Sequence, residues 1–180
     1  VLARAEEFEK TSRLTTWRTA DENFDWGSNR NLANRGRVLL AAYEETGQGR
    51  FLGAALAQVN YIFGQNPFFL SYVTGVGAIF PRNMHHRLQI AARKTRPTLT
   101  LPGFLVGGAN ADAEEAELSS ARGPRKYRDS EASFETNEFA IDNNAALIAL
   151  LGRLNGVTIK QRQSFFDRGE ASEQDVDFDH

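Results

Sequence analysis

The chain has 180 residues, of which 41% are hydrophobic and 24% charged, as expected for a globular domain with its own core. Its net charge of −2 gives no electrostatic reason to expect nucleic acid or an anionic membrane as a partner, and no run approaches the roughly 18 apolar residues of a membrane helix. The lack of cysteine excludes disulfides and thiol catalysis. The chain starts at Val1 without an initiator methionine or a secretory signal pattern, so we expect a piece of a longer protein.

The first 63 residues predict three helices. Apolar side chains recur among charges in residues 1–14, which favours a helix, and the polar residues 15–28 read as a connector. A second helix is expected to be capped by Ser28 or Asn29 and ended by Gly47. A third follows from Arg50 to about Phe63. The short connection between the last two predicts an antiparallel helical hairpin.

Helical periodicity is absent from Gly64 to about Lys126, a stretch that holds all five prolines. Its aromatic and apolar content argues against disorder, so we expect long ordered loops packed over a scaffold. A strand over Thr98–Val106 would be short, because Pro102 and the following glycine interrupt it. The acidic run over residues 112–117 is expected to be a solvated surface turn.

The last helix is predicted to begin near Asn137 and to end near Asn155 or Gly156. We therefore divide the chain into a domain part over residues 1–156 and a charged C-terminal tail over residues 157–180. Helices with long loops at their ends predict an all-α architecture.

Two carboxylates stand close together in the segment Tyr127–Ala146, where Asp129 precedes Glu138 by nine residues. Two acidic groups in one partly buried pocket raise the pKa of one of them, as an acid that protonates a leaving group requires. The start of the following helix would act in the opposite direction, because its partial positive charge favours ionised Glu138. The alternative is a pair of solvated loop acids without a catalytic role.

A second candidate segment, Ser71–Arg87, combines two glycines with the run His85, His86 and Arg87. Adjacent residues do not share a face, so this run is not a two-histidine metal clamp. Its alternatives are a donor-rich ligand turn and an ordinary basic surface turn. The sequence contains no G-x-S-x-G nucleophile motif, no Walker loop and no dinucleotide fingerprint.

Together the two segments resemble the two signature regions of glycoside hydrolase family 9, the inverting β-1,4-glucanases that include many cellulases. The acidic signature Y-x-D-x4-F-x3-E-x-A-x3-N-A is matched from Tyr127 to Ala145 at every defined position. The histidine signature is matched by SYVTGVG and MHHR, except that Ile79 stands where the family has a polar or basic residue. The resemblance also covers WGSN, YIFGQNP and LVGGAN, and therefore most of the chain up to about Leu151.

The resemblance implies that Glu138 is the general acid and Asp129 a supporting carboxylate of the same site. It implies that His85 and Arg87 hold sugar hydroxyls beside the scissile bond. Tyr127 and Phe134 either contact the sugar or pack beneath the pocket, and the same two alternatives stand for Trp26. No role is assigned to His86.

The resemblance also implies that this chain is the C-terminal portion of an (α/α)6 barrel, since about four convincing helices are found where the family has twelve. Inversion needs a second carboxylate as base, which the family draws from an Asp-x-x-Asp motif that this chain lacks. We therefore expect the N-terminal part of the same catalytic domain as a partner, and a poorly folded, inactive product from this chain alone.

The expected function is hydrolysis of β-1,4-glucosidic bonds in cellulose or a related β-glucan. The alternatives are an exo-acting β-glucosidase or glucosaminidase of the same family and a non-catalytic sugar-binding helical domain. No cofactor is expected for the chemistry. The resemblance allows a structural calcium ion, but no ligand is assigned, because the acidic run lacks calcium-loop spacing. It also suggests a secreted or periplasmic protein.

Overall fold

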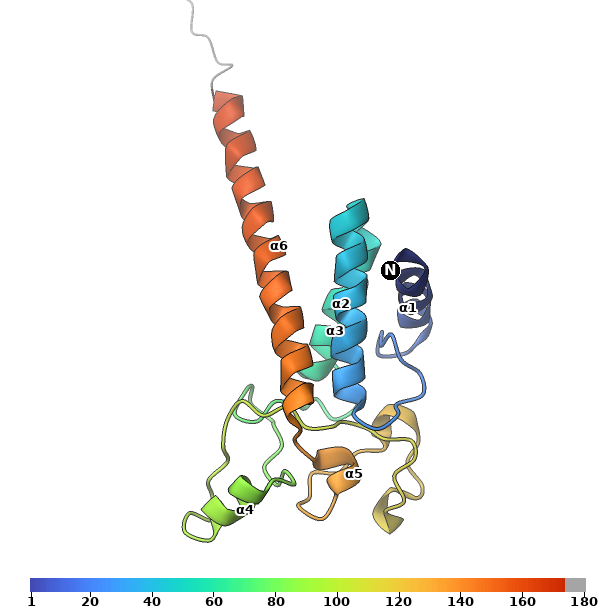
Figure 1. Ribbon diagram of the computed structural model, residues 1–180, viewed down its shortest axis with the longest axis vertical. Coiled ribbons are helices and arrows are strands. Elements are labelled where there is room, and N and C mark those ends of the chain that lie inside the picture. The colour runs from blue at the N-terminus through green and yellow to red at the C-terminus, as the bar shows by residue number, and fades with distance from the viewer. Residues whose placement is uncertain (174–180) are drawn as a thin grey trace, which may run out of the picture.

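A helical hairpin forms the centre of the structure, a computed structural model that describes the backbone of residues 1–173 and the side chains of residues 1–157 (Figure 1). Helix α2 spans Ser28–Thr46 and helix α3 spans Gly49–Ile62. Gly47 ends α2 in the left-handed conformation, with φ 68°, and its N–H donates to the Tyr43 carbonyl at 2.7 Å. The predicted antiparallel hairpin is confirmed.

The predicted cap of α2 is wrong. The N-cap residue is Gly27, and no side chain caps the helix. Asn29 turns away from the helix start, and its side-chain amide donates to the Val106 carbonyl at 2.9 Å. This residue therefore ties the hairpin to the loops rather than closing its own helix.

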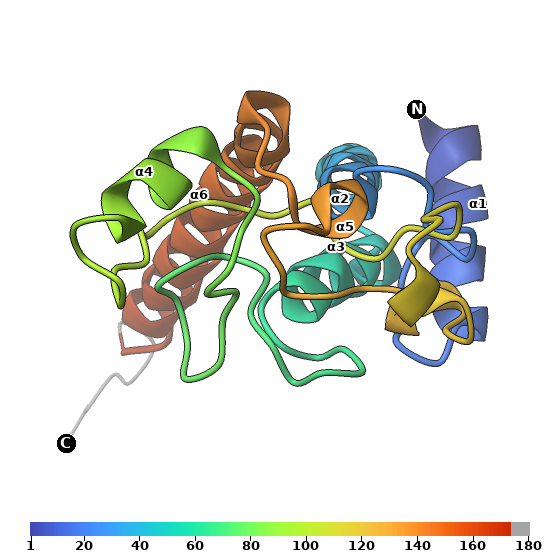
Figure 2. The same ribbon diagram turned by 90° about the horizontal axis from the view of Figure 1, so that it is seen from below.

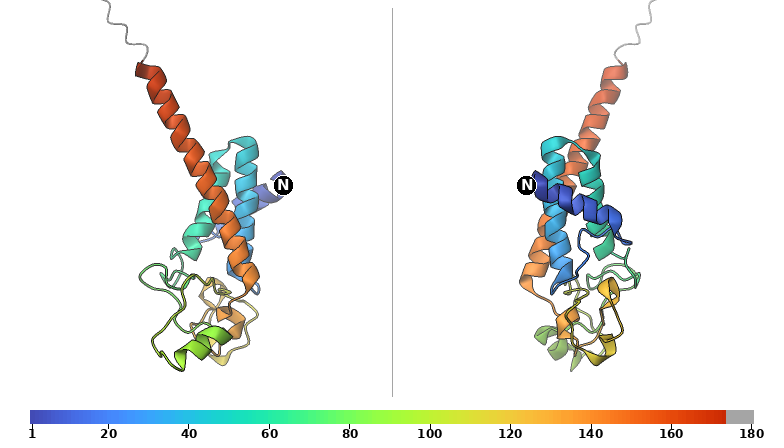
Figure 3. Two further views of the ribbon diagram at one scale, coloured as in Figure 1. Left: turned by 60° about the vertical axis from the view of Figure 1, so that its left-hand side comes forward. Right: turned by 90° about the vertical axis from the view of Figure 1, so that its right-hand side faces the viewer.

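Helix α1, Leu2–Leu14, lies across the hairpin (Figure 3). It is amphipathic only in part, since Ala5 is fully buried whereas Leu14 is 77% exposed. Its buried carboxylate, Glu9, pairs with Arg13 at 2.8 Å and with Arg50 of α3 at 3.6 Å. Residues 15–27 form the expected connector, without a helix.

Helix α6, Ile141–Glu173, packs along α2 and then extends past the hairpin (Figure 1). The close contact requires Gly36, because a Cβ atom there would lie 2.8 Å from Leu150 Cδ2. The predicted helix end near Asn155 or Gly156 is wrong. Neither Gly152 nor Gly156 stops α6, because no proline follows and many of the next residues, such as Lys, Gln and Arg, favour helix. The domain boundary at residue 156 stays a prediction, and residues 174–180 lie outside the described part.

The loops between α3 and α6 gather at one end of the helices (Figures 1 and 2). They contain four short helical elements: α4, Arg87–Arg93; η1, Ala116–Leu118; η2, Gly123–Arg125; and α5, Phe134–Asn137. The prediction of ordered loops is confirmed, although the seven-residue α4 was not expected.

The expected strand over Thr98–Val106 does not form. The backbone there makes only isolated bridges, from Leu105 to Val73 and from Val106 to Phe139. The described residues thus contain helices and single bridges but no strand, which confirms the all-α class. None of the described helices is long and apolar enough to cross a membrane.

The core joins the helices to the loops. It includes Leu32, Leu39 and Leu40 of α2, Phe51 and Ile62 of α3, Leu150 of α6, and Tyr72, Met84 and Leu105 of the loops, all fully buried. The loops therefore rest on a continuous apolar base, which holds the residues they carry in fixed positions.

Candidate functional site

Glu138 and His85 lie side by side at the loop end. The His85 N–H donates to the Asn137 carbonyl at 2.9 Å, and His85 and Glu138 form a parallel bridge. Residues paired across such a bridge point to the same face of the backbone pair. The structure therefore brings the two signature segments together, as the sequence predicts.

Glu138 occupies the extended link between α5 and α6, with φ −75° and ψ 141°. The helix that was expected to begin near Asn137 begins at Ile141, so Glu138 lies outside the helix rather than in its first turn. Its carbonyl accepts a hydrogen bond from Gly107 N at 2.9 Å, so the link is held on both sides. No described residue donates a hydrogen bond to the half-buried Glu138 carboxylate, which leaves it available to a ligand.

The Asp129 carboxylate, in contrast, is engaged by the protein. It accepts hydrogen bonds from the backbone N–H groups of Arg82 and Asn83, both at 2.8 Å. The Asn137 side-chain amide donates to it at 3.0 Å and that of Asn83 at 3.4 Å. Asp129 thus fastens the turn that leads into His85 to the segment that leads into Glu138.

Tyr127 belongs to the same network and is buried. Its hydroxyl donates to Asn137 Oδ1 at 2.7 Å, and the amide of Asn137 donates to the Asn83 carbonyl at 2.8 Å. Burial, helped by the nearby Asp129 charge, raises the pKa of Tyr127 well above its usual value. This geometry supports the packing alternative for Tyr127. Asn137 was missed in the sequence, where its place directly before Glu138 was the available signal.

The two predicted sugar-holding residues differ in how they are held. His85 Nδ1 lies 2.6 Å from the Glu131 carbonyl oxygen, which can only accept, so Nδ1 carries a proton and Nε2 is the remaining ring nitrogen. Arg87 is the first residue of α4 and is exposed, with no ion pair to any described carboxylate. Both offer groups that a polar ligand could use.

A pair of exposed aromatic rings, one of which lies beside His85, is found at the loop end. Phe134 is 49% exposed and Trp26 is 47% exposed, and their ring centroids are 6.0 Å apart. The Phe134 ring lies 6.1 Å from the His85 ring. Exposed rings of this kind can stack on the apolar face of a sugar, so the ligand-contact alternative stays a prediction for Phe134 and Trp26.

Two asparagines to which the sequence analysis gave no role in the site hold the Gly107 segment beneath it. Asn29 N donates to the Gly107 carbonyl at 3.0 Å. Asn144 of α6 accepts from Leu105 N at 2.8 Å and donates to the Gly103 carbonyl at 2.7 Å. Asn29 belongs to the motif WGSN and Asn144 to the N-A pair of the acidic signature, so these motifs were the sequence signal that could have indicated the supporting role.

The acidic run over residues 112–117 does not form a calcium site. Asp112 and Glu114 are exposed, while Glu115 lies 3.7 Å from Arg128 and Glu117 lies 2.8 Å from it. Within the residues whose side chains are described, no group of three or more His, Asp or Glu could hold a metal ion. The arrangement of these carboxylates therefore does not fit a structural calcium ion. The ion pairs of Glu115 and Glu117 with Arg128 also attach the run to the loops, which the expected solvated turn would not do.

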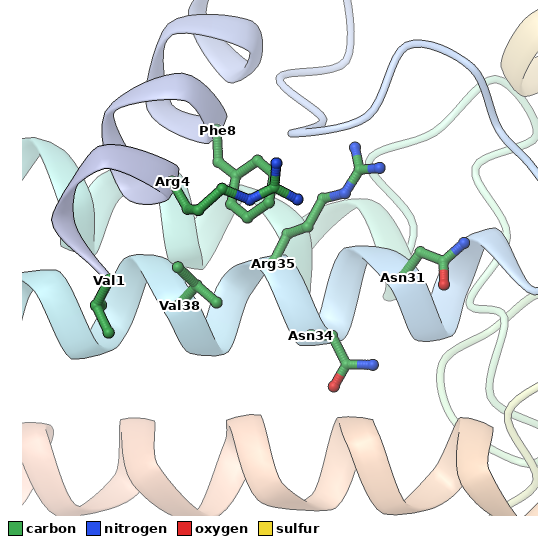
Figure 4. A pocket seen from close by; sticks show the side chains of 7 residues that line it. All are labelled: Val1, Arg4, Phe8, Asn31, Asn34, Arg35 and Val38. Atoms are coloured by element: carbon green, nitrogen blue, oxygen red, sulfur yellow. The ribbon is translucent and has the colours of Figure 1, made fainter.

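A cavity of about 570 Å³ lies away from these residues, between α1 and α2 (Figure 4). It is lined by Val1, Arg4, Phe8, Asn31, Asn34, Arg35 and Val38. It contains none of the predicted site residues.

The sequence matches the model of glycosyl hydrolase family 9 over residues 2–151. The chain belongs to this family. A xyloglucan-specific endo-β-1,4-glucanase of Bacteroides ovatus is 36% identical over 77% of this chain, and endoglucanase D of Acetivibrio thermocellus is 34% identical over 86% of it. These similarities cover 23% of each relative, so the family 9 chain described here spans about a quarter of their length.

Solved family 9 structures agree with this assignment. A metagenome-derived family 9 endoglucanase superposes with a TM-score of 0.76 at 38% identity, covering 83% of this chain and 27% of that one. The family 9 enzyme AaCel9A, solved with a cellobiose-like isofagomine, has a TM-score of 0.76 at 28% identity over 85% of this chain and 30% of its own. The fold is therefore part of an (α/α)6 barrel, as the resemblance implied.

Proposed function

We propose that the protein containing this chain hydrolyses β-1,4-glucosidic bonds of a β-glucan with inversion, and that Glu138 is the general acid. The observation that carries the proposal is the bridge between His85 and Glu138, which places an unengaged carboxylate on the same face as a histidine. The names of the relatives, endoglucanases and a xyloglucan-specific enzyme, support β-1,4-glucans as the substrate class.

In this proposal Glu138 gives its proton to the glycosidic oxygen as the bond to the leaving sugar breaks. His85 Nε2 and the Arg87 guanidinium bind hydroxyls of the neighbouring sugar, while Phe134 and Trp26 stack on a ring. Asp129 and Tyr127 position these groups without touching the substrate. Their hydrogen bonds to Asn83 and Asn137 support that division of roles.

The base that activates water must lie outside this chain in this proposal. An inverting site needs a second carboxylate about 6.5–9.5 Å from the acid. Asp129 is occupied by four donors, and the chain has no Asp-x-x-Asp motif. The N-terminal part of the domain therefore supplies the base, and it is the main protein partner of this chain.

The deciding experiment replaces Glu138 with Gln in the complete enzyme. Loss of a general acid should lower kcat on a β-glucan oligosaccharide by about 10²–10⁴-fold. The loss should be much smaller on an aryl cellobioside with an acidic phenol as leaving group, because that group departs without a proton. Glu135→Gln is the matched control, since glutamine can still accept the hydrogen bond from Glu114 N, which is 3.0 Å long. A loss below tenfold on the oligosaccharide would show that the acid is misassigned.

Exo action is the second candidate, because a cellulose 1,4-β-cellobiosidase of Acetivibrio thermocellus is 31% identical over 76% of this chain. An endo enzyme lowers the viscosity of soluble cellulose before much sugar is released, whereas an exo enzyme releases small sugars first. Oligosaccharide binding without turnover would instead favour a non-catalytic sugar-binding domain.

We also propose a secreted or periplasmic location, because the polymeric β-glucans proposed as substrates are found outside the cytoplasm. Fractionation of the native host should place the activity in the medium or periplasm. Recovery of the activity in the cytoplasm alone would contradict this location.

A further inference from the structure

His86 stands between the two proposed sugar-holding residues, yet the proposed chemistry gives it no role. Its ring packs 5.3 Å from the ring of Phe104 and 5.2 Å from that of Phe139, the latter at 86°. The two phenyl rings also meet edge to face, 4.5 Å apart. These three rings form a cluster, the His86–Phe104–Phe139 cluster.

The cluster lies on the face opposite the proposed acid. Successive side chains on extended backbone point to opposite faces. His85 and Glu138 share one face, so the next residue in each segment, His86 and Phe139, points to the other. The observed contact between the His86 and Phe139 rings agrees with this alternation. The cluster therefore joins, from behind, the same two segments that carry His85 and Glu138.

Packing holds the His86 ring in place. The Nδ1 atom is buried and has no hydrogen-bond partner. Buried ring nitrogens are usually paired, and a partner would fix the ring direction. Without one on Nδ1, the contacts with Phe104 and Phe139 set its position.

The two segments also share little regular backbone pairing. His85 and Glu138 form an isolated bridge rather than part of a strand. Side-chain pairs supply much of the stability of such pairings. Asp129 and Asn137 fasten the two segments at Asn83, two residues before His85. At His85 and Glu138 themselves the spacing also depends on what is packed behind them.

We propose that His86 is a positioning residue, whose ring fixes Glu138 relative to His85 and Arg87. This inference rests on the proposed role of Glu138. Removing the ring would leave a void between the two segments, and they would move toward it. Misplacement of a reacting group by about 1 Å can cost on the order of 10²-fold in rate, whereas substrate affinity is shared with other contacts.

The test compares His86→Ala and His86→Phe in the complete enzyme. His86→Ala should lower kcat on an oligosaccharide by at least about tenfold with KM changed less than threefold, and should shift the basic limb of the kcat/KM pH profile, which reports the acid. His86→Phe keeps a ring and loses no hydrogen bond at Nδ1, so it should restore kcat to within about threefold of wild type.

Leu39→Ala is the control for general loss of stability. Leu39 is fully buried in α2, away from the loop end, and its truncation should lower Tm while leaving kcat and the pH profile unchanged. An unchanged kcat in His86→Ala, or an equal loss in His86→Phe, would overturn the inference. Glu138→Gln, assayed beside the His86 variants, separates the two proposals. If Glu138→Gln keeps its activity, the proposed acid is wrong. If Glu138→Gln is inactive while His86→Ala keeps its activity, only the positioning role of His86 is wrong.

Discussion

At the scale of single residues, the two signature carboxylates have different surroundings. Asp129 is fixed by four donors, whereas Glu138 receives none from the described residues. A carboxylate that must exchange a proton needs room to do so, while one that holds backbone N–H groups needs to stay charged. The same residue type thus serves structure at one position and, in our proposal, chemistry at the other.

Asp129→Asn should therefore act mainly on stability. The new amide group turns a donor toward the Arg82 or Asn83 N–H, so the free energy of unfolding should fall by about 1.5–3 kcal/mol, as for hydrogen bonds to charged groups. The kcat should fall less than in Glu138→Gln. Thermal unfolding and steady-state kinetics of the complete enzyme measure the two effects. A large loss of kcat at unchanged Tm would identify Asp129 as a participant in the reaction instead.

The residues of the site could be predicted from the sequence, but which of them are exposed and which are buried in supporting positions could not. Spacing and resemblance led to Glu138 and His85, which the structure pairs. The burial of Tyr127 depends on Tyr72, 5.0 Å away between ring centroids, and on Asn137, and no local pattern encodes such distant contacts. The His86–Phe104–Phe139 cluster could not be predicted for the same reason, since Phe104 is remote in sequence from His86.

At the scale of elements, long helices were predictable and short ones were not. The hairpin of α2 and α3 carries several turns of apolar periodicity and a terminating Gly47. Helix α4 has seven residues and α5 has four, too few to show a period. The site is carried mostly by these short pieces and loops, whose course is set by tertiary hydrogen bonds such as that of Asn29 to Val106.

Gly108 should be the most sensitive glycine at the junction of α2 and the loops. Its φ is +93°, and an added Cβ would lie 2.7 Å from Asn29 and Ser28 side-chain atoms. Gly108→Ala should cost about 2–5 kcal/mol, from backbone strain and crowding together.

The matched control for this substitution is Gly47→Ala, which has φ +68° but no atom within 4 Å of the new Cβ. It should cost only the strain, about 1–2 kcal/mol. Denaturant unfolding of both variants of the complete enzyme measures the difference. Equal costs would mean that the Asn29 contact tolerates displacement and does not anchor the loops.

At the scale of the molecule, this chain is a part of a barrel, and its surface exposes apolar side chains as expected for an incomplete fold. Ile141 is 81% exposed and Ile148 is 66% exposed, both on α6, and a cavity opens between α1 and α2 (Figure 4). Apolar side chains left in water on helix faces favour association with a partner. This chain corresponds to 27% of the metagenome-derived family 9 endoglucanase, so most of the (α/α)6 barrel lies outside it.

The isolated chain should therefore bind a hydrophobic dye, unfold without a sharp transition and show no hydrolysis of β-glucan. Co-expression with the preceding part of its domain should abolish dye binding and produce activity. Dye fluorescence, calorimetry and a reducing-sugar assay on both samples provide the comparison. Full activity of the 180-residue chain by itself would contradict both the missing base and the incomplete fold.

The bridge between His85 and Glu138 keeps these two residues together when parts of the barrel move relative to one another. The proposed proton donor, Glu138, and His85 are carried by one hydrogen-bonded unit, while the proposed base belongs to another part of the barrel. Relative movement of these parts would change the gap that the attacking water must fit, but not the spacing of donor and histidine. Such a movement would therefore change only the step in which the proposed base activates water.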